Sequence, residues 1–414
     1  AVSKKNSIAL GVAVIINNSK TVAQLTGNLG TSGTSVGEIL IQAVTRHNMD
    51  DDYKTRLGAE AIAGAGSGGS GGFAVAGAVA VIVSNAETNA SVGNDVIIYS
   101  NGNMTVEAIE QSKLAARAWG ASLTDSRFNE QNGSGKTSGS NGNSDSKAGV
   151  GGAYAMIYVN NKTTAEIGDN AQITAKSLLV KAEKQQVSAK ADDIGGNIKI
   201  NGVIKTGSTQ IKDGKVEINT TDDAQSSEDL KLSDLASVVK DLWNLLSNNN
   251  YYLEAVGGAA STENTKFTGA GSFTVLVIND YVAALVGKNV TLILTDGLTV
   301  KAASKVNAVT IAGSVAYGGS KSAGVGINTI IHNSKVNAGL GDGSTVTGAN
   351  GGSWNGDVTI SASGELDLTS ILVAAAASSS KSGNGTQAAG EGVVNIFVNG
   401  NSVTAEIGKN ATIK

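Results

Sequence analysis

The residues best suited to chemistry in this sequence gather in one short stretch. Residues 45–54 read TRHNMDDDYK, in which His47 stands close to Asp50, Asp51 and Asp52. Three adjacent carboxylates offer the oxygen ligands that Ca²⁺ prefers, so a calcium site is one hypothesis. A solvated acidic turn accounts for the same residues without a metal. The sequence predicts no other cofactor.

No arrangement of residues predicts a catalytic centre. The second histidine, His332, lies inside a repeated phrase, and no P-loop, nucleophile elbow or paired zinc-ligand spacing occurs. Glu166 and Glu406 share one slot of the repeat, but Gln24 and Ser91 fill the same slot in other copies. A glycan-cleaving enzyme needs two carboxylates at a defined separation. We therefore predict no enzyme and keep a β-helix polysaccharide-cleaving enzyme as the last alternative.

Aromatic side chains are scarce, at 4% of residues, so the few in variable regions are candidates for contact with a partner. Aromatic side chains anchor many protein interfaces because they bury a large area at a small entropic cost. The candidates for ligand or partner contact are Phe128, Trp243, Tyr251, Tyr252 and Trp354.

The elements that must position these residues follow from a repeat. Six copies of one phrase align on an alanine, as in VAVIVSNAETNASVG (79–93) and YAMIYVNNKTTAEIG (154–168). Successive anchors are 67, 75, 119, 54 and 67 residues apart. A fixed phrase with elastic spacing indicates a repeat array with insertions on one face. The anchors are Ala23, Ala90, Ala165, Ala284, Ala338 and Ala405.

An asparagine stands five residues before five of the six anchors. If the phrases stack in register, the side-chain amides form a hydrogen-bonded ladder along the array. Asparagine also tolerates the left-handed backbone of a turn, so a role in ending the strand is compatible with the ladder. The ladder residues are Asn18, Asn85, Asn160, Asn279 and Asn333.

Short alternating segments rich in Val, Ile and Thr follow each anchor, and Gly, Asn or Asp separates them. Segments of this kind are strands too short to fold alone, and they need an equivalent strand of the next copy as a hydrogen-bond partner. We predict an all-β fold, a parallel β-solenoid (β-helix) repeat array. An antiparallel sandwich is the structural alternative, but it does not explain the recurrence of one phrase.

Composition agrees with continuous backbone pairing and narrows the function classes. The 414 residues include 54 Gly and no Pro, which would remove ladder hydrogen bonds, and no Cys, so no disulfide framework exists. A net charge of −4 with scattered Lys and Arg gives no electrostatic footprint for nucleic acid. No purely apolar run is long enough for a transmembrane segment.

One insertion differs in kind from the other loops. Residues 209–219 read TQIKDGKVEIN, in which Asp-Gly between alternating runs predicts a β-hairpin. Residues 233–250 predict an amphipathic helix, whose apolar stripe would dock on the array or bind a partner. We therefore divide the chain into solenoid repeats at 1–191, an inserted hairpin-plus-helix module at 192–266 and solenoid repeats at 267–414. We expect the array to continue beyond both ends.

The order GGAYAMIYVNNKTTAEIGDNAQITAKSLLVKAEKQQVSAKA (151–191) resembles the repeats of very large leukotoxin-type adhesins of anaerobic bacteria. More broadly, it is similar to filamentous-haemagglutinin-like passengers. The resemblance implies a virulence-associated adhesin that is secreted to the cell surface and attaches to a host-cell or bacterial receptor or glycan. A leukotoxin, or cytolysin, is the second expectation. The resemblance assigns no catalytic residue to this sequence.

Overall fold

The computed structural model describes residues 1–3, 6–47, 57–67, 72–124, 148–185, 209–212, 215–218, 250–261, 266–348, 356–378 and 387–414. Within these ranges the protein is all-β and has no helix. The predicted fold class is confirmed at this level: most described residues belong to strands, and the two main sheets are parallel.

The larger sheet has 12 strands. They are β1 (Val2–Ser3), β3 (Ile39–His47), β4 (Leu57–Ser67), β6 (Ile97–Tyr99), β7 (Met104–Ser112), β8 (Leu114–Thr124), β11 (Gln172–Gln185), β14 (Tyr251–Ser261), β16 (Thr291–Tyr317), β18 (Thr345–Thr347), β19 (Asp357–Ala377) and β22 (Thr412–Ile413).

The smaller sheet has eight strands. They are β2 (Ser7–Leu25), β5 (Phe73–Val92), β9 (Ala148–Val159), β10 (Lys162–Ile167), β15 (Phe267–Val286), β17 (Lys321–Leu340), β20 (Ala388–Asn399) and β21 (Ser402–Ile407).

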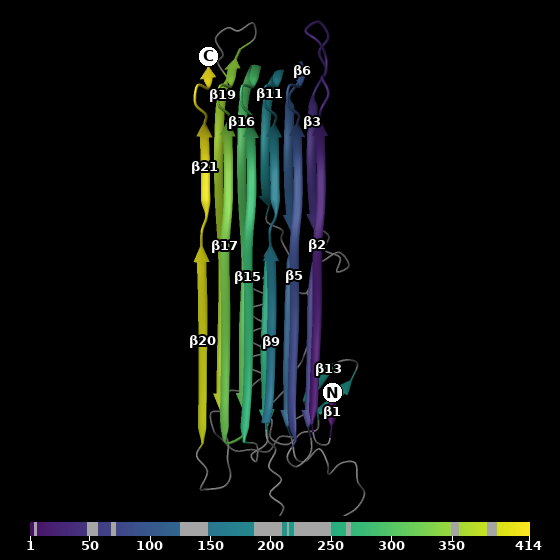
Figure 1. Ribbon diagram of the computed structural model, residues 1–414, viewed down its shortest axis with the longest axis vertical. Helices are drawn as coiled ribbons and strands as arrows, with labels where there is room; N and C mark the ends of the chain where they lie inside the picture. The colour runs from purple at the N-terminus through teal and green to yellow at the C-terminus, as the bar shows by residue number, and fades with distance from the viewer. Residues whose placement is uncertain are drawn as a thin grey trace, which may run out of the picture.

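Each copy of the repeat runs along the smaller sheet, turns, and returns along the larger one. The second copy, for example, passes from β5 to β6, β7 and β8, and the fourth passes from β15 to β16. Figure 1 shows the long strands side by side, with the colour changing from purple at one edge to yellow at the other. Neighbouring strands in space are therefore equivalent strands of successive copies.

The six anchor alanines lie in one register row across the smaller sheet. Ala90 pairs with Ala23 and with Ala165, and Ala284 links Ala165 to Ala338. Ala405 completes the row. Because side chains alternate across a strand, this shared register places the apolar residues of every copy on the same face.

The core fills the space between the two sheets and consists mainly of Ala, Val, Ile and Leu. Small residues allow the backbones of the two sheets to approach each other closely in part of this space. A Cβ at Gly257 of β14 would lie 2.1 Å from the carbonyl oxygen of Gly271 in β15, and one at Gly151 would lie 1.8 Å from that of Gly258. The backbones of the two sheets are in contact there, so no side chain fits between them.

The turns after the anchors also stack. Their third residue has a positive φ in five copies, at 59° for Asp95, 59° for Asn170 and 54° for Asn289. Asp, Asn and Gly tolerate this left-handed backbone better than other residues do. The Asp169 carboxylate accepts a hydrogen bond from the amide N–H of Lys288 at 2.7 Å, which ties one turn to the next.

The structure describes part of the predicted insertion, and one of its borders was wrong. Strands β12 (Thr209–Lys212) and β13 (Lys215–Ile218) pair antiparallel, as predicted for the hairpin. Residues 251–261, placed in the insertion by the sequence, form β14, which pairs with β8 and β16 as a regular strand of the repeat. Residues 233–249 of the predicted helix lie outside the described residues.

In the part of the chain that the structure describes, no helix is long and apolar enough to cross a membrane.

Candidate functional site

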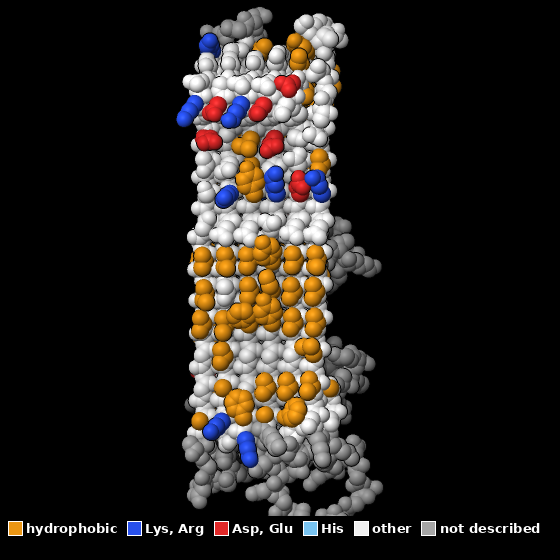
Figure 2. Space-filling view, in the orientation of Figure 1, with side chains coloured by type: hydrophobic (Ala, Val, Ile, Leu, Met, Phe, Trp, Pro, Cys, Tyr) orange, Lys and Arg blue, Asp and Glu red, His pale blue; other side chains and the backbone are white. Residues whose placement is uncertain are grey.

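The outward face of the smaller sheet carries a contiguous apolar surface. Figure 2 shows it as rows of hydrophobic side chains in the middle of the molecule. Its three rows cross six strands, and all members except Thr329 are apolar. The rows are Val12, Val79, Tyr154, Phe273, Ile327 and Val394; Val14, Val81, Met156, Val275, Thr329 and Ile396; and Ile16, Val83, Tyr158, Val277, Ile331 and Val398. We call this set the apolar face.

The apolar face is accessible to solvent. Exposed fractions at its two edges reach 66% for Ile16 and 49% for Val398, and the inner members are partly exposed. With strands about 4.8 Å apart and rows two residues apart, the face spans roughly 25 Å by roughly 15 Å. Apolar patches of this size, a few hundred Å², often mark interaction sites.

Three aromatic residues occupy the centre of the apolar face. Tyr154 and Phe273 stack at a centroid distance of 5.5 Å, and Tyr158 lies further along β9. The sequence analysis missed these residues because it sought aromatics only in variable regions. The available signal was the period-2 pattern of YAMIYV, which puts both tyrosines on the same side of the strand.

Charged pairs lie beside the apolar face toward the turns. Lys20 and Glu87 are 3.0 Å apart on β2 and β5, and Lys288 and Asp342 are 3.8 Å apart at the turns. Figure 2 shows charged side chains gathered in a band toward one end of the face, beyond the central apolar rows. An apolar centre beside a polar border is the usual composition of a protein interface.

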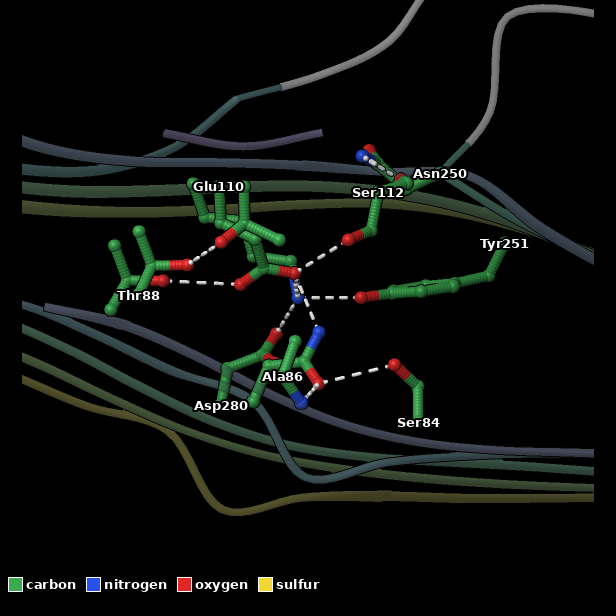
Figure 3. A network of polar contacts seen from close by, with 12 residues as sticks. Ser84, Ala86, Thr88, Glu110, Ser112, Asn250, Tyr251 and Asp280 are labelled. Atoms are coloured by element: carbon green, nitrogen blue, oxygen red, sulfur yellow. Dashed lines mark hydrogen bonds and ion pairs between the residues drawn. The ribbon is translucent and has the colours of Figure 1, made fainter. Parts of the chain in front are cut away.

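A second group of functional side chains lies inside the molecule, between the sheets. Lys184 of β11 donates hydrogen bonds to Asp280 Oδ2 of β15 and to Tyr251 Oη of β14, both at 2.5 Å. Glu110 Oε1 of β7 lies 4.0 Å from the Lys184 Nζ. Figure 3 shows Glu110, Tyr251 and Asp280 pointing toward one another from strands of both sheets. We call these four residues, Lys184, Asp280, Glu110 and Tyr251, the buried charge cluster.

Hydrogen bonds from three side chains hold Glu110 in place. Its Oε1 accepts from Asn161 Nδ2 at 2.5 Å and from Ser112 Oγ at 2.9 Å, and its Oε2 accepts from Thr163 Oγ1 at 3.1 Å. The Asn161 side-chain oxygen in turn accepts from the Ala86 N–H at 2.9 Å. The carboxylate is therefore positioned by donors on both sheets.

Burial changes the proton affinities in this cluster. Loss of water, opposed by Lys184, raises the pKa of Asp280 to about 6. Burial alone would lower the pKa of Lys184, but the charges of Asp280 and Glu110 outweigh it and hold that pKa above its ordinary value. Burial raises the pKa of the Tyr251 phenol as well. The charged lysine is thus retained by its two carboxylates and not by solvent.

Among the aromatic contact candidates, Tyr251 and Tyr252 are buried. Tyr251 has no exposed surface and belongs to the core and the charge cluster, and Tyr252 is 5% exposed and donates a hydrogen bond to Glu254. The prediction that they are exposed contacts was wrong, because these two residues form the start of β14 and do not lie in a loop. Phe128, Trp243 and Trp354 lie outside the described residues, as do Asp50, Asp51 and Asp52.

The asparagines of the predicted ladder lie at equivalent positions of successive copies, four of them within strands. Asn85 Nδ2 donates to Asn18 Oδ1 at 2.9 Å, and Asn333 Nδ2 donates to Asn279 Oδ1 at 3.2 Å. Asn160 lies at the break between β9 and β10, where its backbone N–H donates to Ser84 O. Two side-chain hydrogen bonds thus join copies along this row.

Across the described ranges, no group of three or more His, Cys, Asp or Glu side chains is arranged to hold a metal ion. The fold and these two sites define an all-β protein of stacked repeats with an outward apolar surface. Comparison with protein-family models, with curated proteins and with solved structures finds no match for this chain.

Proposed function

We propose that this chain is part of a parallel β-solenoid in a bacterial cell-surface adhesin, and that the apolar face is its attachment surface. The in-register pairing of equivalent strands supports the solenoid, because each copy provides one layer of both sheets. Such arrays present wide, regular surfaces that are used in binding. An extracellular location follows from this proposal.

The observation that carries the proposal is the composition of the apolar face. Residues on the outward side of a solvated sheet are usually polar, whereas here Val, Ile, Tyr, Phe and Met occupy three adjacent rows. Desolvation of such a surface gives a favourable free energy of binding. Its stacked aromatic pair, Tyr154 and Phe273, has the character of residues that dominate binding energies at interfaces. The partner that fits is a protein receptor with an apolar patch of its own.

The proposal also includes further layers of the same stack. Val393 and Phe397 of β20 pair with residues of β17 that face the core, Gly326 and Ile330. Their side chains therefore point to the same side as the core, yet they are 51% and 48% exposed. Another layer of the array would cover these side chains and extend both sheets. This supports the expectation that the repeats continue in the parent chain.

The test measures binding of the purified chain to host cells, to bacterial cells and to a glycan panel. A triple variant, Tyr154→Ser with Tyr158→Ser and Phe273→Ser, should weaken cell binding by at least about tenfold, because one hot-spot aromatic contributes about 2 kcal/mol or more. The matched control, Lys162→Ala with Glu166→Ala, changes two outward polar residues on β10 and should bind normally.

Unfolding midpoints of both variants must first show that the sheets remain intact. Equal cell binding by the triple variant and the unchanged chain would exclude the apolar face as the attachment surface. Selective binding to glycans would replace the protein receptor with a carbohydrate. Absence of binding to every cell type, together with leakage from liposomes, would favour the cytolysin instead.

A further inference from the structure

The buried charge cluster brings an amine and a carboxyl group together where water is excluded. The Lys184 side chain is fully buried, and those of Asp280 and Glu110 are each 1% exposed. The Lys184 Nζ is 2.5 Å from Asp280 Oδ2, so the carboxyl carbon is only one bond further away. Holding the amine beside the carboxyl group turns their encounter into an intramolecular one, which supplies part of the advantage of such reactions.

The charged form of this pair is poorly supported by its surroundings. Asp280 Oδ1 is buried and has no hydrogen-bond partner among the described residues. A buried carboxylate with an unsatisfied oxygen loses much of the solvation that it had in water. Transfer of the ammonium proton to a carboxylate gives a neutral amine beside a neutral acid. The raised pKa of Asp280 favours this transfer and the raised pKa of Lys184 opposes it, so the short distance between Nζ and the incompletely hydrogen-bonded carboxyl group is what carries the reaction.

We propose that Lys184 and Asp280 join in an intramolecular isopeptide bond, with Glu110 as the catalytic carboxyl group. The lone pair of the neutral Nζ attacks Cγ of the protonated Asp280, and a new N–C bond forms. Glu110 accepts the proton that the nitrogen loses and returns a proton to the departing hydroxyl. One C–O bond breaks and one water molecule leaves. The reaction is a condensation and needs no oxidant, reductant or further reactant.

Glu110 is suited to this role by position. Three side-chain donors fix its carboxylate, and its Oε1 is 4.0 Å from Nζ, so the two groups approach without sharing a hydrogen bond in the unreacted state. General acid–base groups often lie somewhat beyond hydrogen-bond reach before the reaction begins. Tyr251 Oη, 2.5 Å from Nζ, holds the amine in place from a third side.

The bond would connect the two sheets across two copies of the repeat. Lys184 belongs to β11 of the larger sheet, and Asp280 belongs to β15 of the smaller sheet, 96 residues further along the chain. The closed loop contains the insertion that follows β11. A chain cut within this insertion would remain a single covalent molecule through the isopeptide bond alone, because the protein has no cysteine.

An internal control is available on the same strand. Lys181 Nζ lies 2.6 Å from Glu183 Oε2 and 3.1 Å from Glu107 Oε1, so it is as close to a carboxylate as Lys184, which lies 2.5 Å from Asp280 Oδ2. These three side chains are partly exposed, between 14% and 23%. Solvent stabilises their charges, so Lys181 should remain unmodified. Lys181 therefore separates the effect of proximity to a carboxylate from the effect of full burial, which we propose the bond requires.

The first measurement is the intact mass of the folded protein after denaturation. We expect a mass lower than that of the sequence by one water molecule, and a branched tryptic peptide that joins Lys184 to Asp280. Glu110→Gln and Lys184→Arg should each restore the full mass. Asp280→Asn should lose ammonia in place of water. A full mass for the unaltered, folded protein, or a loss that maps to other residues, would overturn the proposal.

The second measurement gives a result on a chain with an intact cluster, and Lys184→Arg serves as a comparison. A specific protease site is placed between residues 219 and 249, and the folded protein is cut there. On a denaturing gel the two pieces should migrate as one species, and in Lys184→Arg they should separate. Separation of the pieces from the otherwise unaltered chain would contradict the bond, even if every substitution in the cluster prevented folding.

Discussion

Gly257 of β14 faces the carbonyl oxygen of Gly271 in β15 at a distance that leaves no room for a methyl group. A Cβ at Gly257 would lie 2.1 Å from this oxygen, whereas one at Gly271 would have nothing within 4 Å. The two glycines therefore have opposite tolerances, although they belong to the same contact. This asymmetry arises because Gly257 points into the space between the sheets and Gly271 points out of it.

Substitution of the inward glycine should destabilise the protein. Gly257→Ala forces the backbones of β14 and β15 apart, and overpacking of this kind costs about 2 kcal/mol or more. Gly271→Ala is the matched control and should change stability by less than about 0.5 kcal/mol. Urea unfolding followed by circular dichroism measures both. Equal losses for the two variants would show that the sheets do not touch there.

The anchor alanines should resist enlargement. Ala284 is fully buried and pairs with Ala165 on one side and Ala338 on the other, so a larger side chain meets equivalent residues in both neighbours. We expect Ala284→Leu to cost about 1–3 kcal/mol. Leu285→Met, one position along and on the outward side, should cost less than about 0.5 kcal/mol. An unchanged thermal midpoint for Ala284→Leu would argue against a closely packed row.

The outward side of the larger sheet contains a buried ion pair that can be tested by a double substitution. Arg117 Nε is 3.1 Å from Glu254 Oε2, and their side chains are 8% and 1% exposed. Arg117→Met leaves a buried carboxylate without its cation and should cost about 3–5 kcal/mol. Adding Glu254→Gln removes the charge and should recover most of the loss. If Arg117→Met alone is neutral, the pair contributes nothing to stability.

Acidic pH should weaken the fold through His332. Burial, partly opposed by its hydrogen bond with Asn399 Oδ1, lowers the pKa of this imidazole below its ordinary value. While the Lys184 amine remains charged, it lowers this pKa further. The unfolded chain therefore binds a proton more readily, so stability present above the unfolded pKa is lost as pH falls through and below about 6.5.

The measurement compares unfolding midpoints at several pH values between about 5 and 8. His332→Asn, which places the same residue type beside Asn399, should reduce the loss of stability toward acid. Burial raises the pKa of Asp280 to about 6 in the pair without the isopeptide bond, so any titration of Asp280 contributes a background that the substitution leaves unchanged. A variant with the same pH dependence as the unaltered protein would rule out His332 as the source.

The sequence by itself determined the repeat register. Six alanines at irregular spacing pair in a single row, because side chains alternate along every strand and only one alignment buries the apolar set of all copies. The hairpin at Thr209–Ile218 was also predictable, because Asp-Gly dictates a local turn. Tyr251 and Tyr252 were assigned to the insertion because a long stretch of sequence separates β14 from β11, the strand of the larger sheet that precedes it in the chain.

Only the tertiary structure decided which residues meet between the sheets. Alignment of the copies reveals neighbours within one sheet, such as Asp280 and Ser334, but it contains no information about the opposite sheet. Lys184 and Asp280 occupy unrelated slots of the repeat, 96 residues apart, and they meet because each copy folds back upon itself. The pairing depends on where the turn lies and on how closely the two sheets pack, which no periodic pattern along the chain records.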